Sequence, residues 1–153
     1  MILVTGGRAQ GKRAFVETQL CGKAPVCWVD GATAGLKEME AAKYCFNFQA
    51  FLRRVLGGEF LADLGSWAEP KLQADLGSQA EPKLQSAPEF LAQRFLFADP
   101  SRVIVTDEIG GGIVPISGEE RNWREETGRT CCCMAALSEQ VWRVVCGIGT
   151  RIK

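Results

Sequence analysis

The sequence predicts an α/β protein whose sheet is mainly parallel and flanked by helices. Short apolar runs of strand length alternate along the chain with longer segments of helical periodicity. Arg102–Thr106 (RVIVT) has a continuous apolar core, which is typical of a strand buried on both faces of a parallel sheet. The opening run, Met1–Thr5, leads directly into a glycine-rich turn and a helix. Strands and helices that alternate in this way pack as layers around one sheet.

The N-terminal half contains a second apolar run and two predicted helices. Gly11–Cys21 is the first helix, and three of its side chains are available to face a core: Ala14, Phe15 and Leu20. Pro25–Val29 (PVCWV) is the second short apolar run. Lys37–Leu56 has apolar residues at a helical period, and we expect one long helix that Gly57-Gly58 ends.

The C-terminal half is predicted to contain two helices, a strand and a tail. Pro88–Ala98 carries a helical apolar stripe. Ser117–Glu120 (SGEE) has the spacing of a capping box, and the helix that it opens runs to about Ser138. Val141–Cys146 is a predicted strand, followed by a terminal extension, Thr150–Lys153. Opposite charges four residues apart are expected to support the second helix, at Glu120/Arg124, Arg121/Glu125 and Glu125/Arg129.

Residues 62–85 are a tandem duplication, ADLGSWAEPKLQ followed by ADLGSQAEPKLQ. Each copy carries a Gly and a Glu-Pro pair, which disfavour a continuous helix through both copies. We expect a solvated surface insertion; a binding element is the alternative. Loop-closure entropy rises slowly with length, so a surface loop tolerates such an addition. The functional site is therefore expected on either side of the repeat.

Length and composition predict one domain, residues 1–153, and exclude several function classes. The net charge is zero and no basic block is present, which disfavours a nucleic-acid partner. No apolar run approaches a membrane span, and the opening MILVTGG leaves no room for a signal peptide, so we expect a cytoplasmic protein. The seven cysteines, with Cys131–Cys133 adjacent, are expected to be reduced and structural. The chain has no histidine, which excludes an imidazole base or ligand within it.

Thr5–Arg13 (TGGRAQGKR) contains the phosphate-loop pattern Gly-x-x-x-x-Gly-Lys between the first predicted strand and the first predicted helix. Glycines let the backbone curl so that its N–H groups face phosphate oxygens, and the following helix presents its positive end. Lys12 is expected to reach the outer phosphates. The predicted fold is therefore of the phosphate-loop NTPase type; a glycine-rich turn with a surface lysine is the alternative. The predicted nucleotide-binding residues are Gly6, Gly7, Arg8, Ala9, Gln10, Gly11, Lys12 and Arg13.

The predicted metal site departs from this pattern at Arg13. The pattern has Ser or Thr there, whose hydroxyl binds Mg²⁺, whereas a guanidinium has no acceptor atom and repels the cation. Asp107 and Glu108 follow RVIVT and are similar to the acidic pair that ends a second phosphate-loop strand. We expect Asp107 to hold Mg²⁺ through water and Glu108 to orient an attacking hydroxyl. Alternatively, both residues cap the loop Gly110–Gly112.

Four separated motifs, in order, resemble one family. MILVTGGRAQGK is similar to the opening of the bifunctional adenosylcobinamide kinase/adenosylcobinamide-phosphate guanylyltransferases of cobalamin biosynthesis. VIVTDEIGGGIVP resembles that family's stretch Asn-Glu-Val-Gly, a variable residue, then Gly-Ile/Val-Val-Pro. WREETGR resembles its Phe-Arg-Asp-x-x-Gly-Arg, and VWRVVCGIGTRIK resembles its C-terminal strand and tail. The likeness covers residues 1–30 and Arg102–Lys153.

The chain also departs from that family. The family's loop ends in Gly-Lys-Ser, where this chain has Gly11-Lys12-Arg13, and the family's Gly-Arg-x-Asn-Gln becomes Gly128–Cys132. The family's guanylyl carrier is a histidine on the helix after the second strand, and an ungapped alignment from Glu38-Met39 places Cys45 and Phe46 there. The family's central strand, with its acidic end, has no clear counterpart in the sequence; the repeat occupies that region.

The resemblance implies an adenosylcobinamide kinase with Lys12 and Glu108 as catalytic residues. The donor is ATP or GTP, the acceptor is the corrinoid's aminopropanol hydroxyl, and the Mg²⁺ site is weakened by Arg13. The missing histidine argues against guanylyltransferase activity. The resemblance also implies a homo-oligomer. The alternatives are a degenerate homologue that binds nucleotide or corrinoid without turnover, and a small-molecule kinase of another specificity.

Overall fold

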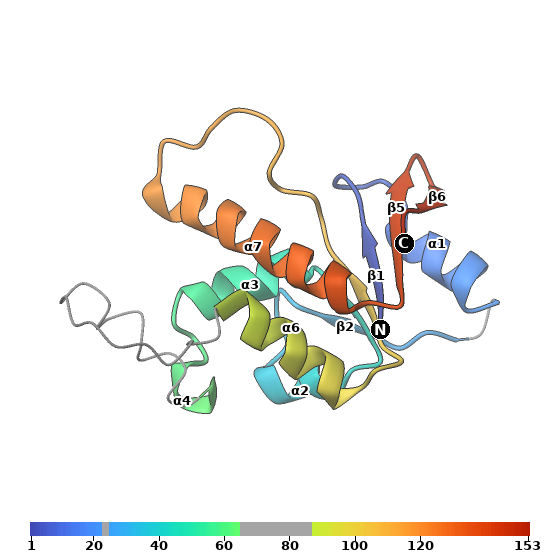
Figure 1. The fold of residues 1–153 in the computed structure, drawn as a ribbon, viewed down its shortest axis with the longest axis horizontal. Coiled ribbons are helices and arrows are strands. Elements are labelled where there is room, and N and C mark those ends of the chain that lie inside the picture. Colours follow the sequence, from blue (N-terminus) through green and yellow to red (C-terminus); the bar gives the residue numbers. More distant parts are fainter. Residues whose placement is uncertain (23–24, 65–86) are drawn as a thin grey trace.

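The computed structural model describes residues 1–22, 25–64 and 87–153 (Figure 1). Within them, six strands form one sheet in the order β2-β3-β4-β1-β5-β6. All neighbouring pairs are parallel except β5 and β6, which are antiparallel. The α/β prediction, with a mainly parallel sheet of the phosphate-loop type, is therefore confirmed. The strands are β1 (Ile2–Thr5), β2 (Trp28–Asp30), β3 (Tyr44–Phe46), β4 (Val103–Val105), β5 (Gln140–Val145) and β6 (Ile148–Arg151).

Helices cover both faces of the sheet. Helices α2, α3, α6 and α7 lie on one side and α1 on the other (Figure 1). None of the helices in the described ranges combines the length and the apolar character that crossing a membrane requires. The helices are α1 (Lys12–Phe15, continued by a π-helical turn, Val16–Leu20), α2 (Leu36–Ala41), α3 (Phe48–Leu56), α4 (Leu61–Leu64), α6 (Ala87–Ala98) and α7 (Gly118–Leu137).

Strand β1 separates two apolar clusters because consecutive side chains of a strand point to opposite faces. Leu3 packs with the larger cluster, and Val4 packs with the smaller one under α1. The larger cluster contains an aromatic group in which the rings of Phe48 and Phe95 meet edge to face, with centroids 5.2 Å apart. The two clusters fix β1 in the middle of the sheet, with its carboxyl end free to begin the glycine-rich loop.

The predicted single helix over Lys37–Leu56 is wrong. The structure divides the segment into α2, strand β3 and α3. Ala42 leaves the helical conformation, with φ −73° and ψ 127°, and Asn47 adopts φ 54° before α3 begins. Between them, Tyr44 pairs with both β2 and β4. Backbone hydrogen bonds to two neighbouring strands therefore outweigh the helical spacing of the apolar residues.

This correction changes the comparison with the resembled family. Strand β3 lies between β2 and β4, but Asn47 rather than an acidic residue follows it, so it does not supply the acidic strand end of the family's central strand. The ungapped placement of Cys45 and Phe46 on a helix is wrong, because both lie in β3. The helix that does follow the second strand is α2, which has six residues.

Several smaller expectations are also settled. Ala14 is exposed rather than in the core, and the predicted extension Thr150–Lys153 begins within the edge strand β6. Ser117 is confirmed as the N-cap, since its side chain accepts a hydrogen bond from the Glu120 backbone N–H, but the Glu120 carboxylate pairs with Arg53 and does not complete a capping box. Of the duplication, residues 62–64 fall in α4, and the expectation of a surface insertion over the remainder lies outside the described residues.

Of the three predicted charge pairs on α7, the structure shows the last. Glu125 and Arg129 form an ion pair of 2.5 Å. Glu120 instead pairs with Arg53 of α3 at 2.5 Å. Arg121 and Arg124 donate to backbone carbonyls of the loop before the helix, at residues 111–116. These three side chains therefore contact α3 and the preceding loop instead of one another. A rule based on spacing within one helix does not consider such contacts.

Candidate functional site

The loop between β1 and α1 has a backbone that requires its two flanking glycines. Gly6 has φ 148°, and a Cβ at this residue would lie 2.2 Å from the Val144 carbonyl oxygen. Gly11 has φ 79° and Ala9 has φ 59°, both in the left-handed region. The loop curls tightly at the carboxyl end of β1, at the edge of the sheet where ligands of open α/β proteins bind.

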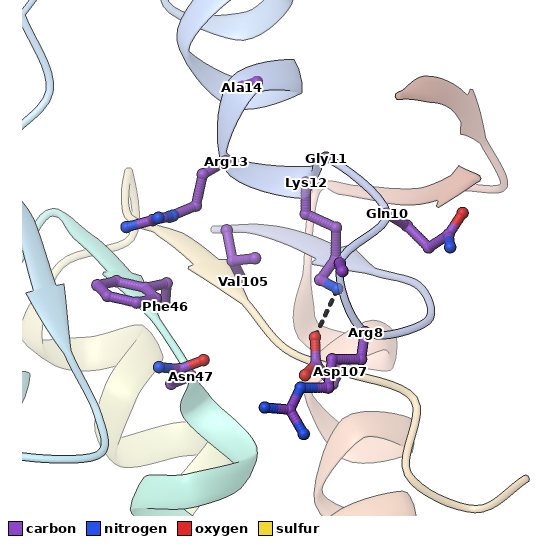
Figure 2. A pocket seen from close by; sticks show the side chains of 11 residues that line it. Arg8, Gln10, Gly11, Lys12, Arg13, Ala14, Phe46, Asn47, Val105 and Asp107 are labelled. Atoms are coloured by element: carbon purple, nitrogen blue, oxygen red, sulfur yellow. Dashed lines mark ion pairs between the residues drawn. The ribbon is translucent and has the colours of Figure 1, made fainter. Parts of the chain in front are cut away.

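Lys12 is buried inside this curl. Its side chain is 7% exposed, and Nζ donates to the carbonyl oxygens of Gly6 (3.1 Å) and Gly7 (2.7 Å). The same ammonium forms an ion pair of 2.5 Å with Oδ1 of Asp107, the dashed contact in Figure 2. Lys12 is therefore not a surface lysine. It is a charge held at the centre of the loop by three oxygen atoms.

Asp107 is fixed from the opposite side by Gln49, which the sequence analysis did not single out. The Gln49 amide donates from Nε2 to Asp107 Oδ2 (3.1 Å), and its Oε1 accepts from the Asp107 backbone N–H (3.1 Å). Gln49 is 8% exposed and lies in the first turn of α3. No local signal marks this residue, because its partner lies 58 positions away and the segment read as one continuous helix.

Glu108 lies next to the loop but faces a different partner. Its backbone N–H donates to Gly6 O (3.0 Å), and its carboxylate contacts the Arg143 guanidinium at two positions, both 3.1 Å. Within the described residues, the carboxylates of Asp107 and Glu108 pair with Lys12, Gln49 and Arg143. The alternative in which both cap the loop at residues 110–112 is therefore wrong.

A cavity of about 490 Å³ opens beside the loop (Figure 2). It gathers six of the predicted nucleotide-binding residues and Asp107, but not Gly6, Gly7 or Glu108. Three cationic side chains face a single carboxylate there, so the cavity suits an anionic ligand. The lining residues are Arg8, Ala9, Gln10, Gly11, Lys12, Arg13, Ala14, Phe46, Asn47, Val105 and Asp107.

Arg13 lies on the side of the cavity away from Lys12 (Figure 2). Its guanidinium carbon is 4.4 Å from the centroid of the Phe46 ring, within the range of a cation–π contact. The neighbouring Asn47 side chain donates to Asp30 Oδ1 at 2.9 Å, which fixes the turn between β3 and α3. Phe46 and Asn47 belong to the site because β3 is a strand; the helix expected over this segment concealed them.

The cavity offers one carboxylate, Asp107, to a Mg²⁺ ion that arrives with a nucleotide, and this ion would have to displace Lys12 or Gln49 from one of its oxygens. Mg²⁺ at phosphate sites is commonly held by one or two carboxylates, phosphate oxygens and water. Asp107 supplies one carboxylate at the edge of the cavity, and residue 13 supplies no hydroxyl. No cluster of three or more His, Cys, Asp or Glu side chains suited to a metal is present in the described ranges. Asp107 is thus the residue that could hold the ion.

Comparison with known proteins shows the family of this chain. The family model described as cobinamide kinase / cobinamide phosphate guanyltransferase matches residues 57–152, more than half of the chain. The chain belongs to this family. It is 49% identical over 51 residues to the bifunctional adenosylcobalamin biosynthesis protein CobU of Escherichia coli (strain K12). It is 47% identical, also over 51 residues, to the protein of the same description from Salmonella typhimurium.

The match to these two relatives is partial. The aligned stretch covers 33% of this chain and 28% of each relative, so the chain matches well under a third of their length. The phosphate loop also precedes the range that the family model matches. The match therefore shows the family, and it does not include the phosphate loop.

Proposed function

We propose that this chain is a cobinamide kinase-like enzyme that transfers the terminal phosphoryl group of ATP or GTP to adenosylcobinamide. One observation carries the proposal: Lys12 sits at the centre of a curled glycine loop and pairs directly with Asp107 of the neighbouring strand end. The cationic cavity beside this pair suits a triphosphate, and family membership supports the corrinoid as acceptor.

Catalysis in this proposal consists of positioning and electrostatic stabilisation. The loop N–H groups and Lys12 bind the phosphates, so Lys12 exchanges its loop carbonyl partners for phosphate oxygens. Asp107, kept in place by Gln49, would hold Mg²⁺ after its Oδ1 leaves Lys12, and the metal would supply neutralisation of the developing charge. The aminopropanol oxygen attacks the terminal phosphorus, the bond to the bridging oxygen breaks, the nucleoside diphosphate leaves with that electron pair, and the hydroxyl proton passes to solvent. Glu108 orients that hydroxyl, which requires Glu108 to leave Arg143.

A second candidate is a homologue that binds nucleotide or corrinoid without turnover. The position of Arg13 favours it, because the residue that normally provides a metal-binding hydroxyl stacks on Phe46 instead. Neither candidate includes guanylyl transfer through a histidine of this chain, since the chain contains none. The homo-oligomer implied by the family resemblance stays a prediction, which sedimentation of the purified chain can test.

Transfer of labelled terminal phosphate to adenosylcobinamide tests the proposal. Lys12→Ala should abolish transfer, whereas Lys37→Ala, on the exposed face of α2, should leave it unchanged. Nucleotide binding by calorimetry is measured on the same samples. Binding without transfer by the natural chain favours the non-catalytic homologue, and transfer that survives Lys12→Ala contradicts the proposed role of the loop.

A further inference from the structure

The phosphate loop is attached to the hairpin of β5 and β6, at the C-terminal end of the chain. The Gln10 side chain accepts a hydrogen bond at Oε1 from the Cys146 backbone N–H (2.7 Å), and the Gln10 carbonyl accepts one from the Gly147 N–H (2.9 Å). Figure 2 shows Gln10 pointing away from Lys12. One residue at the outer side of the loop is therefore held twice by one turn.

The hairpin turn has the geometry needed to make both bonds. Val145 and Ile148 are paired strand residues, so Cys146 and Gly147 form a two-residue connection. Both have positive φ, 52° and 79°, as in the turns that match the twist of a hairpin. The two successive N–H groups of the turn meet the carbonyl and side-chain oxygens of Gln10.

Close backbone packing joins the same two segments. A Cβ added to Gly11 would lie 3.2 Å from Gly147 Cα, and one added to Gly6 would lie 2.2 Å from Val144 O. On the far arm of the hairpin, a Cβ added to Gly149 would lie 2.2 Å from the Phe15 ring of α1. Both ends of the loop thus lie against the hairpin backbone to backbone, and the helix after the loop contacts the hairpin through the Phe15 ring.

We propose that Gln10 is a positioning residue that holds the phosphate loop in its ligand-ready shape by bracing it on the C-terminal hairpin. Ala9 and Gly11, on either side of Gln10, adopt left-handed backbone angles, so this part of the loop has no regular structure to stabilise it. Two hydrogen bonds to a rigid turn reduce the ordering that a phosphate ligand must otherwise impose. The ligand part of the inference rests on the proposed function; the brace itself concerns the free chain.

The test compares Gln10→Ala with Gln10→Glu. The carboxylate keeps an oxygen acceptor for the Cys146 N–H, and alanine does not. Hydrogen exchange of the segment 6–12 in the free protein should be several times faster in Gln10→Ala and close to natural in Gln10→Glu. Gln19→Ala, exposed on the turn after α1, is the matched control and should leave exchange unchanged.

Calorimetry with inorganic tripolyphosphate and with ATP provides the second readout. The loss of one hydrogen bond predicts affinities roughly three- to tenfold weaker in Gln10→Ala, and equally so for both ligands. Unchanged exchange in Gln10→Ala overturns the brace, and so does a loss of affinity confined to ATP, which would mean that Gln10 contacts the nucleoside. Faster exchange in a chain that binds neither ligand upholds the brace and refutes the proposed function.

Discussion

Replacing Arg13 by serine tests whether the missing hydroxyl limits the metal site. The natural guanidinium lies over the Phe46 ring at 4.4 Å, and the residue follows Lys12 at the start of α1. Arg13→Ser removes one of the three cations that line the cavity and places a hydroxyl at the position where the phosphate-loop pattern provides a Mg²⁺ ligand.

The substitution has two effects, one on the stability of the fold and one on the affinity for Mg²⁺-ATP. Loss of the Phe46 contact should lower the free energy of unfolding by about 0.5–1 kcal/mol, as for an exposed cation–π pair. The substitution also removes the repulsion between the Arg13 guanidinium and the incoming Mg²⁺. Two unit charges 4 Å apart interact by about 1 kcal/mol in water and about 4 kcal/mol near a protein surface. Because the guanidinium lies on the side away from Lys12, we expect this repulsion to be at the low end of that range (Figure 2). The affinity for Mg²⁺-ATP should therefore rise roughly tenfold, which corresponds to about 1.4 kcal/mol.

Titration calorimetry with ATP, with and without Mg²⁺, measures this change. Without the metal, Arg13→Ser should bind ATP more weakly than the natural chain, since a guanidinium can pair directly with phosphate oxygens. Arg8→Ser is the matched control: it removes a cation from the same cavity without adding a hydroxyl at residue 13, and it should weaken binding under both conditions. Tight, strictly Mg²⁺-dependent binding by the natural chain that Arg13→Ser does not improve would refute the reasoning.

Four further outcomes follow from the sequence and the fold. Deleting Ala74–Gln85 should change the free energy of unfolding by less than about 1 kcal/mol, and a chain that no longer shows a cooperative thermal melt would mark the repeat as core. Incubation with labelled GTP should leave no acid-labile label on the denatured chain, because it has no imidazole; a labelled band would reveal another nucleophile. Phe95→Ala should cost about 3–5 kcal/mol in urea titrations, since the ring is fully buried against Phe48; a cost below about 1 kcal/mol would contradict this packing. Burial raises the pKa of the Cys45 thiol to about 12, so at pH 8 maleimide should label exposed Cys146 within minutes and Cys45 only after unfolding; equal rates in mass spectra would exclude the buried strand.

The sequence was informative wherever the signal was local. The glycine loop, the first strand and the helix cap at Ser117 each depend on residues within a few positions of one another, and the structure has all three elements. The buried strand after Arg102 was recognisable because three consecutive apolar residues need two covered faces. The same local reasoning failed over Lys37–Leu56, where apolar spacing fits a helix while the backbone of Tyr44–Phe46 pairs with two strands.

By itself, the sequence determined the fold class, the position of the phosphate loop and the identity of its lysine. Only the tertiary structure decided which groups meet that lysine. The order β3-β4-β1-β5 brings Gln49 and Asp107 to one side of the loop and the Cys146 turn to the other, across separations of up to 136 residues. Such contacts leave no local pattern, because a parallel sheet gathers its strand ends at one edge whatever their distance along the chain. The residues that form the loop are therefore adjacent in the sequence, whereas strand order decides which distant residues contact and orient them.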